Sequence, residues 1–397
     1  MRGFSAAAAA FAGPAFYLFR LVYFLRMASP PPPPAGPRRR RPAAQLSTGQ
    51  KYLRGGFLLF AFLMVSFSYY FYQLFFTPNV FVPDGRRVVV RIHPGQSYRA
   101  TMDSIEATGV IADKLSLNFM AKLKDYDKQV KPGLYELTDQ LTNPQLINRL
   151  RAGEQTPVRL TIRPARLRRQ LTARLDREFA GRRGQFDSLL RDPAYVRGLN
   201  LGMDTTTVVS LFLPDTYEVW WTTPPASIIQ KMKVAYERYW TAERRAKAEN
   251  LGLTPVQVST LASIVQGEQQ LHTDEHPRIA GVYLNRLRRG MLLQADPTVV
   301  YAIGSRTGDF LIRRVTGEML RTESPYNTYR VKGLPPGPIM IPTKGAIDAV
   351  LNAEDHKYLY FCAKEDFSGY HNFAETVADH NANARRYRTA LDTRGIR

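Results

Sequence analysis

Hydrophobic residues form one long uninterrupted stretch near the start of the chain. The segment GGFLLFAFLMVSFSYYFYQLFF runs from Gly55 to Phe76 without a charged residue. A helix of about 20 apolar residues is long enough to cross a hydrocarbon core of roughly 30 Å. Tyr69, Tyr70 and Tyr72 crowd its C-terminal half, as aromatic residues do where a helix meets the membrane surface. We therefore predict a transmembrane helix over 55–76 rather than a buried helix of a soluble protein.

Shorter patterns in residues 84–163 predict a small α+β module. Apolar runs bounded by turn residues indicate strands in the sequences VVVRI, KPGLYELTD and PVRLTI. Helical spacing indicates one helix from Ser97 through Ile105, one from Ala112 to Leu123, and one in NPQLINRLRAG that is closed by Gly153. The strand–helix–helix–strand order resembles LysM-like modules, which hold glycan chains, although an unspecialised α+β domain would share it.

The remaining residues, 164–397, predict a mixed α/β domain that begins with charged helices. The segment LFLPDTYEVWW interrupts this helical region and places Asp215 and Glu218 beside Tyr217 and two tryptophans. That combination suits carbohydrate, because sugar C–H faces stack on aromatic rings while hydroxyls meet carboxylates. A loop whose aromatic residues fill a core would have the same composition. The whole chain is thus predicted to be α+β, with a single N-terminal transmembrane helix, a small LysM-like module and a mixed α/β domain.

A later helix carries the first candidate for chemistry. Thr254 is a good N-cap and Pro255 suits the first helical turn. Apolar residues then repeat at i, i+3, i+4 and i+7 and predict an inward face, formed by Val258, Leu261, Ala262 and Val265. Glu268 is the next residue on that face.

The position of Glu268 suggests a general acid. A carboxyl group on an apolar face loses solvation, which raises its pKa and allows it to hold a proton near neutral pH. Cleavage of a glycosidic bond requires such a group. The alternative is a structural glutamate that is exposed at the helix end or paired with Arg278 or Arg286.

Three polar segments punctuated by glycine and proline follow this helix. They are YLNRLRRGMLLQADPTVVYAIG, SPYNTYRVKGLPPGPIMIP and YLYFCAKEDFSGYHNF. Segments of this kind often carry binding residues, although loops alone could explain some of them. The candidates for binding sugar hydroxyls are Asn285, Arg286, Gln294, Asp296, Tyr326, Asn327, Tyr329 and His371.

Charge indicates how the chain is oriented. The net charge is +21, and residues 1–83 contain nine basic residues and no acidic one. A basic pole fits nucleic acid or an anionic membrane surface. Because the RRRR run, Lys51 and Arg54 all precede the apolar stretch, we expect that flank to stay in the cytoplasm. Everything after Asp84 would then lie outside the inner (plasma) membrane, where a nucleic-acid partner is not expected.

The first residues allow several interpretations. Residues 1–27 are apolar but interrupted by Pro14 and Arg20, so they could form a signal-like segment or a second membrane helix. We favour Met27 as the true start, since it opens an ordinary proline-rich tail, MASPPPPPAGPRRRR. Residues 1–54 are then a cytoplasmic basic tail of which 1–26 are not translated.

The number of cysteines and the spacing of histidines argue against disulfides and metal sites. Cys362 is the only cysteine, so no intrachain disulfide can form. The six histidines show no metal-ligand spacing, and we expect neither a metal nor a cofactor.

Several long blocks together make a specific resemblance. LASIVQGEQQ, NRLRRGMLLQADPTVVYAIG, SPYNTYRVKGLPPGPI and YLYFCA…GYHNF resemble, in order, the signature blocks of the MltG/YceG family. These are single-span inner-membrane endolytic murein transglycosylases. The resemblance implies a LysM-like module over 84–163, a catalytic domain over 164–397, and Glu268 as the essential acid.

Two positions depart from the family pattern. Gln266 replaces the first glutamate of the family's E-x-E pair, and Val209 and Ser210 replace an acidic residue and a glycine before PDTYE. If a carboxylate at 266 tunes Glu268, the substitution Gln266→Glu would shift the pH optimum upward.

The resemblance implies cleavage of the β-1,4 bond between N-acetylmuramic acid and N-acetylglucosamine in nascent peptidoglycan strands. The products would carry 1,6-anhydro ends, and cleavage would terminate strand elongation. Partners implied are glycan strands, the inner membrane and the peptidoglycan synthases of elongation or division. Two alternatives stay open: a non-catalytic glycan-binding scaffold that regulates wall synthases, and a muramidase that uses Asp296 as a second carboxylate. A pyridoxal-phosphate lyase fits poorly, because no phosphate-binding cup is visible.

Overall fold

The computed structural model describes residues 47–181, 183–312 and 314–395 of the 397-residue chain. Two compact units make up the chain, 1–69 and 70–397. The predictions for the first 27 residues, the Met27 start and the RRRR run lie outside the described residues.

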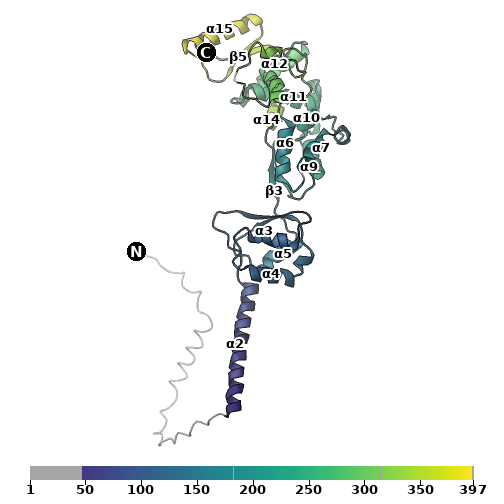
Figure 1. The fold of residues 1–397 in the computed structure, drawn as a ribbon. Coiled ribbons are helices and arrows are strands. Elements are labelled where there is room, and N and C mark those ends of the chain that lie inside the picture. The colour runs from purple at the N-terminus through teal and green to yellow at the C-terminus, as the bar shows by residue number, and fades with distance from the viewer. Residues whose placement is uncertain (1–46, 182, 313, 396–397) are drawn as a thin grey trace, which may run out of the picture. The chain divides into compact units, whose positions relative to one another are not determined.

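The predicted apolar helix is present as α2, Thr48–Phe76 (Figure 1). It begins earlier than the predicted 55–76 and includes Lys51 and Arg54 in its first two turns. Among the described residues it is the one helix long and apolar enough to cross a membrane. Most of its phenylalanine and leucine side chains are exposed among the described residues, and an apolar environment such as a membrane would cover them.

The elements that follow α2 surround a small hydrophobic core. They are β1 Val88–Ile92, α3 Tyr98–Glu106, α4 Lys114–Leu123, η1 Tyr126–Lys128, β2 Gly133–Leu137 and α5 Asn143–Ala152. The two strands are antiparallel, with Val88 opposite Leu137 and Ile92 opposite Gly133. The predicted helices are confirmed, and side-chain caps fix where each begins: Ser97 caps α3, Asp113 caps α4 and Thr142 caps α5. Gly153 ends α5 in the left-handed conformation, as predicted.

The third strand of the 84–163 segment pairs elsewhere. It is β3, Val158–Thr161, and its partner is β4, Thr216–Val219, with Leu160 opposite Tyr217. Leu160 and Ile162 belong to a second hydrophobic core, which the residues after 158 build. The polypeptide therefore changes from one core to the other at about residue 157, a few residues before the predicted boundary.

Helices dominate around the second core. They are α6 Arg168–Glu178, α7 Gln185–Arg191, α8 Pro193–Gly198, η2 Val208–Leu211, α9 Pro225–Tyr239, α10 Ala242–Asn250, α11 Pro255–Glu268, η3 Thr273–Glu275, α12 His276–Arg288, α13 Asp296–Thr307, η4 Met319–Arg321, α14 Lys344–Leu351 and α15 Val377–Thr393. One more antiparallel pair, β5 Tyr360–Ala363 and β6 His371–Ala374, precedes the last helix. Helices and strands are thus mixed, in agreement with the predicted α+β class.

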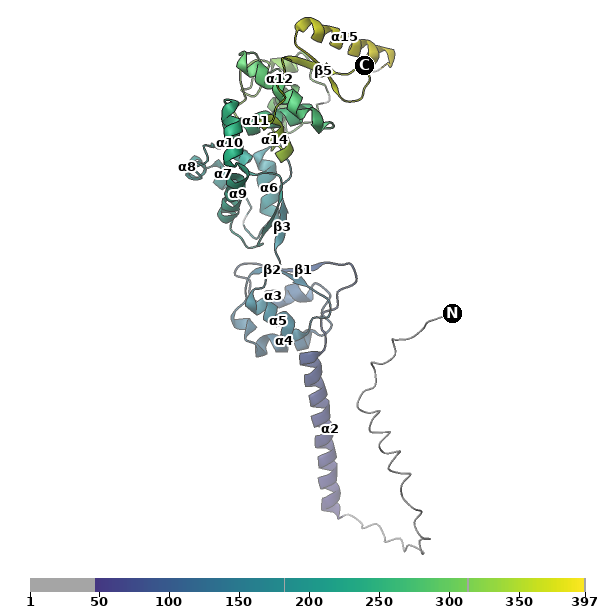
Figure 2. The same cartoon turned by 180° about the vertical axis from the view of Figure 1, so that it is seen from behind.

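The helix α11 occupies the middle of this arrangement. It packs against α12, α13 and α14, and both views of the chain show it next to α12 and α14 (Figures 1 and 2). A helix with neighbours on several sides is buried around most of its circumference. Eight consecutive residues of α11, from Val258 to Val265, are accordingly buried.

Candidate active site

The catalytic candidate lies at the end of α11, which the sequence builds with a reciprocal cap. The Thr254 hydroxyl accepts the Gln257 N–H (3.2 Å), and the Gln257 side chain accepts the Thr254 N–H (2.8 Å). The predicted inward face is confirmed, because its four residues, Val258, Leu261, Ala262 and Val265, have no exposed surface. The buried helix carries that face forward to Glu268, its last residue.

Glu268 is half-buried and carries an unusual carboxyl group. Loss of solvation is the main cause that raises its pKa, to about 8. The hydrogen bond from Tyr283 opposes that rise, the negative charge of Asp296 adds to it, and the positive charge of Arg286 opposes it. At neutral pH the carboxyl group therefore holds its proton, as a general acid must.

Tyr283 is the direct partner that sequence reasoning missed. Its hydroxyl donates a hydrogen bond of 2.6 Å to Oε1 of Glu268, and its ring is buried on α12. The ring of Phe361, on β5, meets it edge-on with 5.9 Å between ring centroids. A signal was available: the hydroxyl of a tyrosine on the inward face of a helix needs a hydrogen-bond partner.

Arg286 lies one turn beyond Tyr283 on α12 and is buried. Its guanidinium donates to the carbonyl groups of Leu359 (2.6 Å) and Leu293 (2.7 Å). It also lies 5.2 Å from the centre of the Tyr360 ring. These donors hold main-chain segments together, while the charge acts on Glu268 at a distance. A sugar could contact Arg286, as predicted, only through a guanidinium group that already donates to these main-chain carbonyls.

Asp296, whose charge acts on Glu268, forms a hydrogen-bonded pair with Tyr329. The Tyr329 hydroxyl donates to Oδ1 of Asp296 over 2.6 Å. Asp296 is exposed at the start of α13. The approach of α13 depends on Gly267, where an added Cβ would lie 2.8 Å from the Cβ of Pro297. Burial and the charges of Asp296 and Glu268 raise the pKa of Tyr329, so its hydroxyl stays a donor.

Two further candidates shape the loops around this pair. Asn285 donates to the carbonyl groups of His356 (2.7 Å) and Tyr358 (3.1 Å) and so fixes the approach to β5. Gln294 is exposed and adopts a left-handed backbone with φ of 51°. Of Asn285 and Gln294, only Gln294 has an exposed side chain that a sugar could contact.

Tyr326 and Asn327 hold the loop that presents Tyr329. Asn327 is buried, and its amide donates to the carbonyl groups of Leu320 (2.9 Å) and Thr322 (2.8 Å). The Tyr326 ring packs 4.7 Å from that of Tyr301. Both residues support the site from within the fold.

His371 is held by a buried carboxylate close to the end of α11. The ring Nδ1 of His371 lies 2.8 Å from Oε2 of Glu275, and the backbone N–H of His371 donates to Oε1 of Glu275 over 3.0 Å. The side chain of Gln269, the residue after Glu268, donates to the same Oε2 over 3.0 Å. The His371 ring also meets Phe361 edge-on, so it reaches Tyr283 through one intervening ring.

The candidates on β4 and directly before it, Tyr217, Glu218 and Asp215, are placed away from Glu268. Lys344, at the start of α14, binds the carboxylate of Asp215, and this hydrogen bond lowers the pKa of Asp215. The Tyr217 hydroxyl donates to the carbonyl of Leu213 over 2.9 Å, while Glu218 is exposed. None of the three is among the groups that act on Glu268 in the described structure.

Gln266 faces away from Glu268, because residues two apart on a helix point to opposite sides. The side-chain oxygen of Gln266 accepts the Thr343 N–H over 2.7 Å, and its side-chain NH₂ group donates to the sulfur of Met340 at 3.4 Å. Gln266, Met340 and Thr343 line a cavity of about 370 Å³ that does not include Glu268. The described residues contain no group of three or more side chains suited to a metal ion.

Glu268, Tyr283, Asp296 and Tyr329 thus define a site for general acid–base chemistry, built around one carboxyl group with a raised pKa. The YceG-like family matches residues 90–386, and the chain belongs to that family.

Individual relatives are similar over most of the chain. An endolytic murein transglycosylase of Bacillus subtilis is 26% identical over 315 residues, which make up 76% of this chain and 84% of the relative. One of Streptococcus pneumoniae is 27% identical over 361 residues, or 82% of this chain but 63% of that protein. A crystal structure of a putative YceG-like protein from Listeria monocytogenes superposes with a TM-score of 0.51 at 27% identity, covering 75% of this chain and 98% of that one.

Proposed function

We propose that this chain is an endolytic murein transglycosylase in which Glu268 acts as both general acid and general base. One observation supports this activity above the others. Glu268 is the last residue of a largely buried helix, its pKa is raised to about 8, and its hydrogen-bond donor is a neutral hydroxyl rather than a cation. Such a carboxyl group can give up a proton and take one back near neutral pH. The names of the relatives from Bacillus subtilis and Streptococcus pneumoniae give the same activity.

The reaction needs a single carboxyl group. Glu268 donates its proton to the oxygen that links C1 of N-acetylmuramic acid to C4 of N-acetylglucosamine, and the C1–O bond breaks. The C6 hydroxyl of the same muramic acid attacks C1, and its proton passes to the Glu268 carboxylate. The products are a 1,6-anhydro end and a free C4 hydroxyl, and no water is consumed. An intramolecular nucleophile replaces the second protein carboxylate, because proximity makes it effective.

The neighbours of Glu268 divide the remaining work. Tyr283 occupies Oε1, which leaves Oε2 for the transferable proton. The same hydrogen bond stabilises the carboxylate that forms when the proton leaves. Asp296 raises the pKa of Glu268, and its negative charge would favour the positive charge that develops at C1. Tyr329 holds Asp296 in place.

The proposed location is the inner membrane, with α2 as the single span and the N-terminus in the cytoplasm. Lys51 and Arg54 at the start of α2 support this orientation. Reporter fusions after Arg54 and after Thr156 test it. The first fusion should be cytoplasmic and the second external, whereas two cytoplasmic reporters would overturn the external enzyme.

The 84–163 segment is proposed to bind glycan as LysM-like modules do, and the 164–397 segment to catalyse cleavage. The order β1, α3, α4, β2 is the support for the LysM-like proposal. Nascent strands as substrate would bring the enzyme close to the synthases of elongation or division, which are the proposed protein partners. Crosslinking in cells and co-purification of a synthase would test that partnership.

The decisive test of activity is mass spectrometry of glycan strands after incubation with the full chain. Wild type should release anhydro ends. Glu268→Gln keeps the side-chain shape but cannot exchange a proton, so it should bind strands and lose about 10²–10⁴-fold in rate. Asp296→Asn is the paired control, and its loss should be smaller. Equal losses with reducing-end products would indicate a two-carboxylate muramidase, and normal cleavage by folded Glu268→Gln would remove Glu268 from the mechanism.

A further inference from the structure

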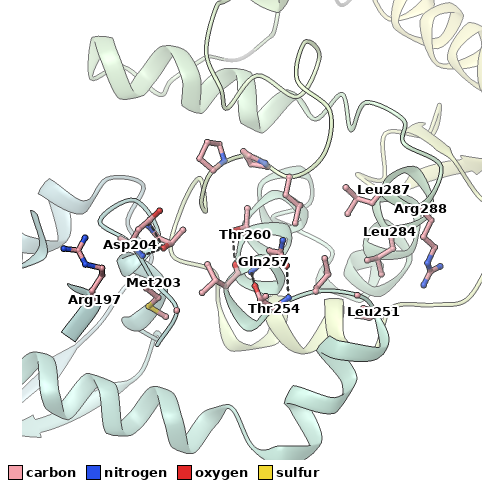
Figure 3. A pocket seen from close by; sticks show the side chains of 18 residues that line it. Arg197, Met203, Asp204, Leu251, Thr254, Gln257, Thr260, Leu284, Leu287 and Arg288 are labelled. Carbon is pink, nitrogen blue, oxygen red and sulfur yellow. Dashed lines mark hydrogen bonds between the residues drawn. The ribbon is translucent and has the colours of Figure 1, made fainter. Parts of the chain in front are cut away.

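A separate cavity of about 820 Å³ opens at the other end of α11 (Figure 3). The 197–207 segment forms one side, the first half of α11 lies in the middle, and the end of α12 forms the other side. Leu334 and Pro336 contribute a further wall. Its volume is within the range of about 300–1,000 Å³ that is typical of ligand sites. None of Glu268, Tyr283, Asp296 or Tyr329 lines it.

One residue of α11 that lines the cavity points to the same side of the helix as the catalytic carboxyl group. Gln257, which lines the cavity, and Glu268 are separated by about three full helical turns, so their side chains point in nearly the same direction. The separation along the helix axis is about 16 Å. On α12, Tyr283 contacts Glu268 and the next residue, Leu284, lines the cavity. A glycan whose cleaved bond lies at Glu268 would reach the cavity within a few sugar units.

Its charged groups sit at its edges. Arg197 and Arg288 lie on opposite sides of the cavity in Figure 3, and both are exposed. Within the part of the chain that the structure describes, neither guanidinium forms a salt bridge. Two guanidinium groups without a carboxylate partner suit a ligand that carries carboxylates.

One carboxylate also lines the cavity, and its own turn stabilises its charge. Oδ1 of Asp204 accepts the N–H groups of Thr206 (2.9 Å) and Thr207 (2.8 Å) and the Thr207 hydroxyl (2.8 Å). Burial raises the pKa of Asp204, but these hydrogen bonds outweigh it and the pKa lies below its usual value. Asp204 is therefore ionised and can meet an amino group.

The other walls combine apolar side chains with the polar side chains of Thr254, Gln257 and Thr260. Met203, Leu287 and Pro335 face the space between the charged edges. The apolar side chains accept methyl groups, and the polar side chains suit the N–H and C=O groups of a peptide backbone. Carboxylates at the edges, an amino group and short aliphatic side chains together describe a short acidic peptide.

We infer that this cavity binds the stem peptide of the murein strand, one or more sugar units from the cleaved bond, with Arg197 and Arg288 holding its carboxylates. The inference rests on the proposed function, since it takes the murein strand as substrate. It makes the peptide, and not only the glycan, a determinant of where the strand is cut.

The test compares strands that carry peptides with strands from which an amidase has removed them. Full-length wild type should show a higher kcat/KM on the peptide-bearing strands. The double variant Arg197→Gln/Arg288→Gln should lose that advantage, with kcat/KM on peptide-bearing strands reduced about tenfold and a far smaller change on stripped strands. Arg289→Gln is the matched control: it removes an exposed arginine that adjoins Arg288 but does not line the cavity.

Each other outcome has a defined meaning. Equal cleavage of both strands by wild type, or equal losses on both strands in the double variant, would overturn the inference. If wild type produces no anhydro ends on either strand, the proposed function fails, and calorimetry with the free stem peptide decides about the cavity. Binding that the double variant loses and Arg289→Gln keeps would uphold a peptide site, whereas no binding would overturn it.

Discussion

Two polar clusters in this protein are built on opposite principles. In the first core, Asn79, Ser116 and Asn143 are buried and neutral, and they satisfy one another. Asn79 donates to Oδ1 of Asn143 over 2.7 Å, and Asn143 donates to the Ser116 hydroxyl over 3.0 Å and to the carbonyl of Leu74 over 3.3 Å. The cluster at Glu268 contains ionisable groups instead, and burial opposes the charge of its central carboxyl.

The difference separates a stabilising network from a reactive one. Neutral groups with complete hydrogen bonds pin elements together, here the end of α2 to the start of α5, without any dependence on pH. A carboxyl group with a raised pKa lowers stability whenever it ionises, and folds keep such groups where chemistry needs them. Substitutions should therefore have opposite effects on stability in the two clusters.

The largest effect on stability is expected from Asn143→Ala. The change removes two donors and one acceptor in the first core and leaves the Leu74 carbonyl and part of Asn79 unpaired. The free energy of unfolding should fall by about 2–3 kcal/mol, by the same amount at pH 5 and pH 8. Urea denaturation at both pH values measures it. Asn250→Ala, at an exposed position on α10, is the control and should change little.

Glu268→Gln should raise the free energy of unfolding, whereas Asn143→Ala should lower it. The unfolded carboxyl group titrates near 4.5 and the folded one near 8, so between these values the folded state holds the extra proton. Its contribution to stability is present below pH 4.5 and is lost as the pH rises to about 8. The variant should therefore match wild type in stability at low pH and exceed it by about 1–2 kcal/mol at pH 8.5. A difference that does not vary with pH would mean that the native pKa is ordinary.

Tyr283→Phe should change the pH profile of cleavage. Its hydroxyl favours the ionised form of Glu268, so removing it should raise the pKa further above 8. The alkaline fall in rate, where Glu268 loses its proton, should move up by roughly one pH unit. Rates across pH 6–10 test this. Tyr236→Phe is the matched control, because that tyrosine is also buried but its hydroxyl has no hydrogen-bond partner among the described residues. The pH profile of this variant should follow that of wild type.

The smallest effect is expected at Gln266. Sequence reasoning connected a carboxylate at this position with a higher pH optimum, but the side chain contacts Thr343 and Met340 on the other side of α11. Gln266→Glu should therefore leave the pH optimum of cleavage unchanged. A shift as large as that of Tyr283→Phe would show that charge at 266 reaches Glu268 through the helix.

Local pattern was enough to predict most elements. A cap is formed by residues within one turn, so Ser97, Thr142 and Thr254 fix helix starts without help from the rest of the fold. Apolar periodicity likewise fixes the buried face of α11 and the position of Glu268 at its end. The partner of β3 was beyond such reasoning, because Leu160 pairs with a residue more than fifty positions later.

The sequence by itself thus determined the apolar helix, the caps and the carboxyl group at the end of a buried face, since all depend on neighbours a few residues apart. Tertiary structure decided what surrounds that carboxyl group. Tyr283 reaches Glu268 only because α11 and α12 pack together, and Tyr329 reaches Asp296 from 33 positions away. The same packing commits Arg286 and Asn285 to main-chain carbonyls rather than leaving them free. The type of a residue limits which groups its side chain can bind. The packing of distant elements against one another determines which of those groups it actually contacts.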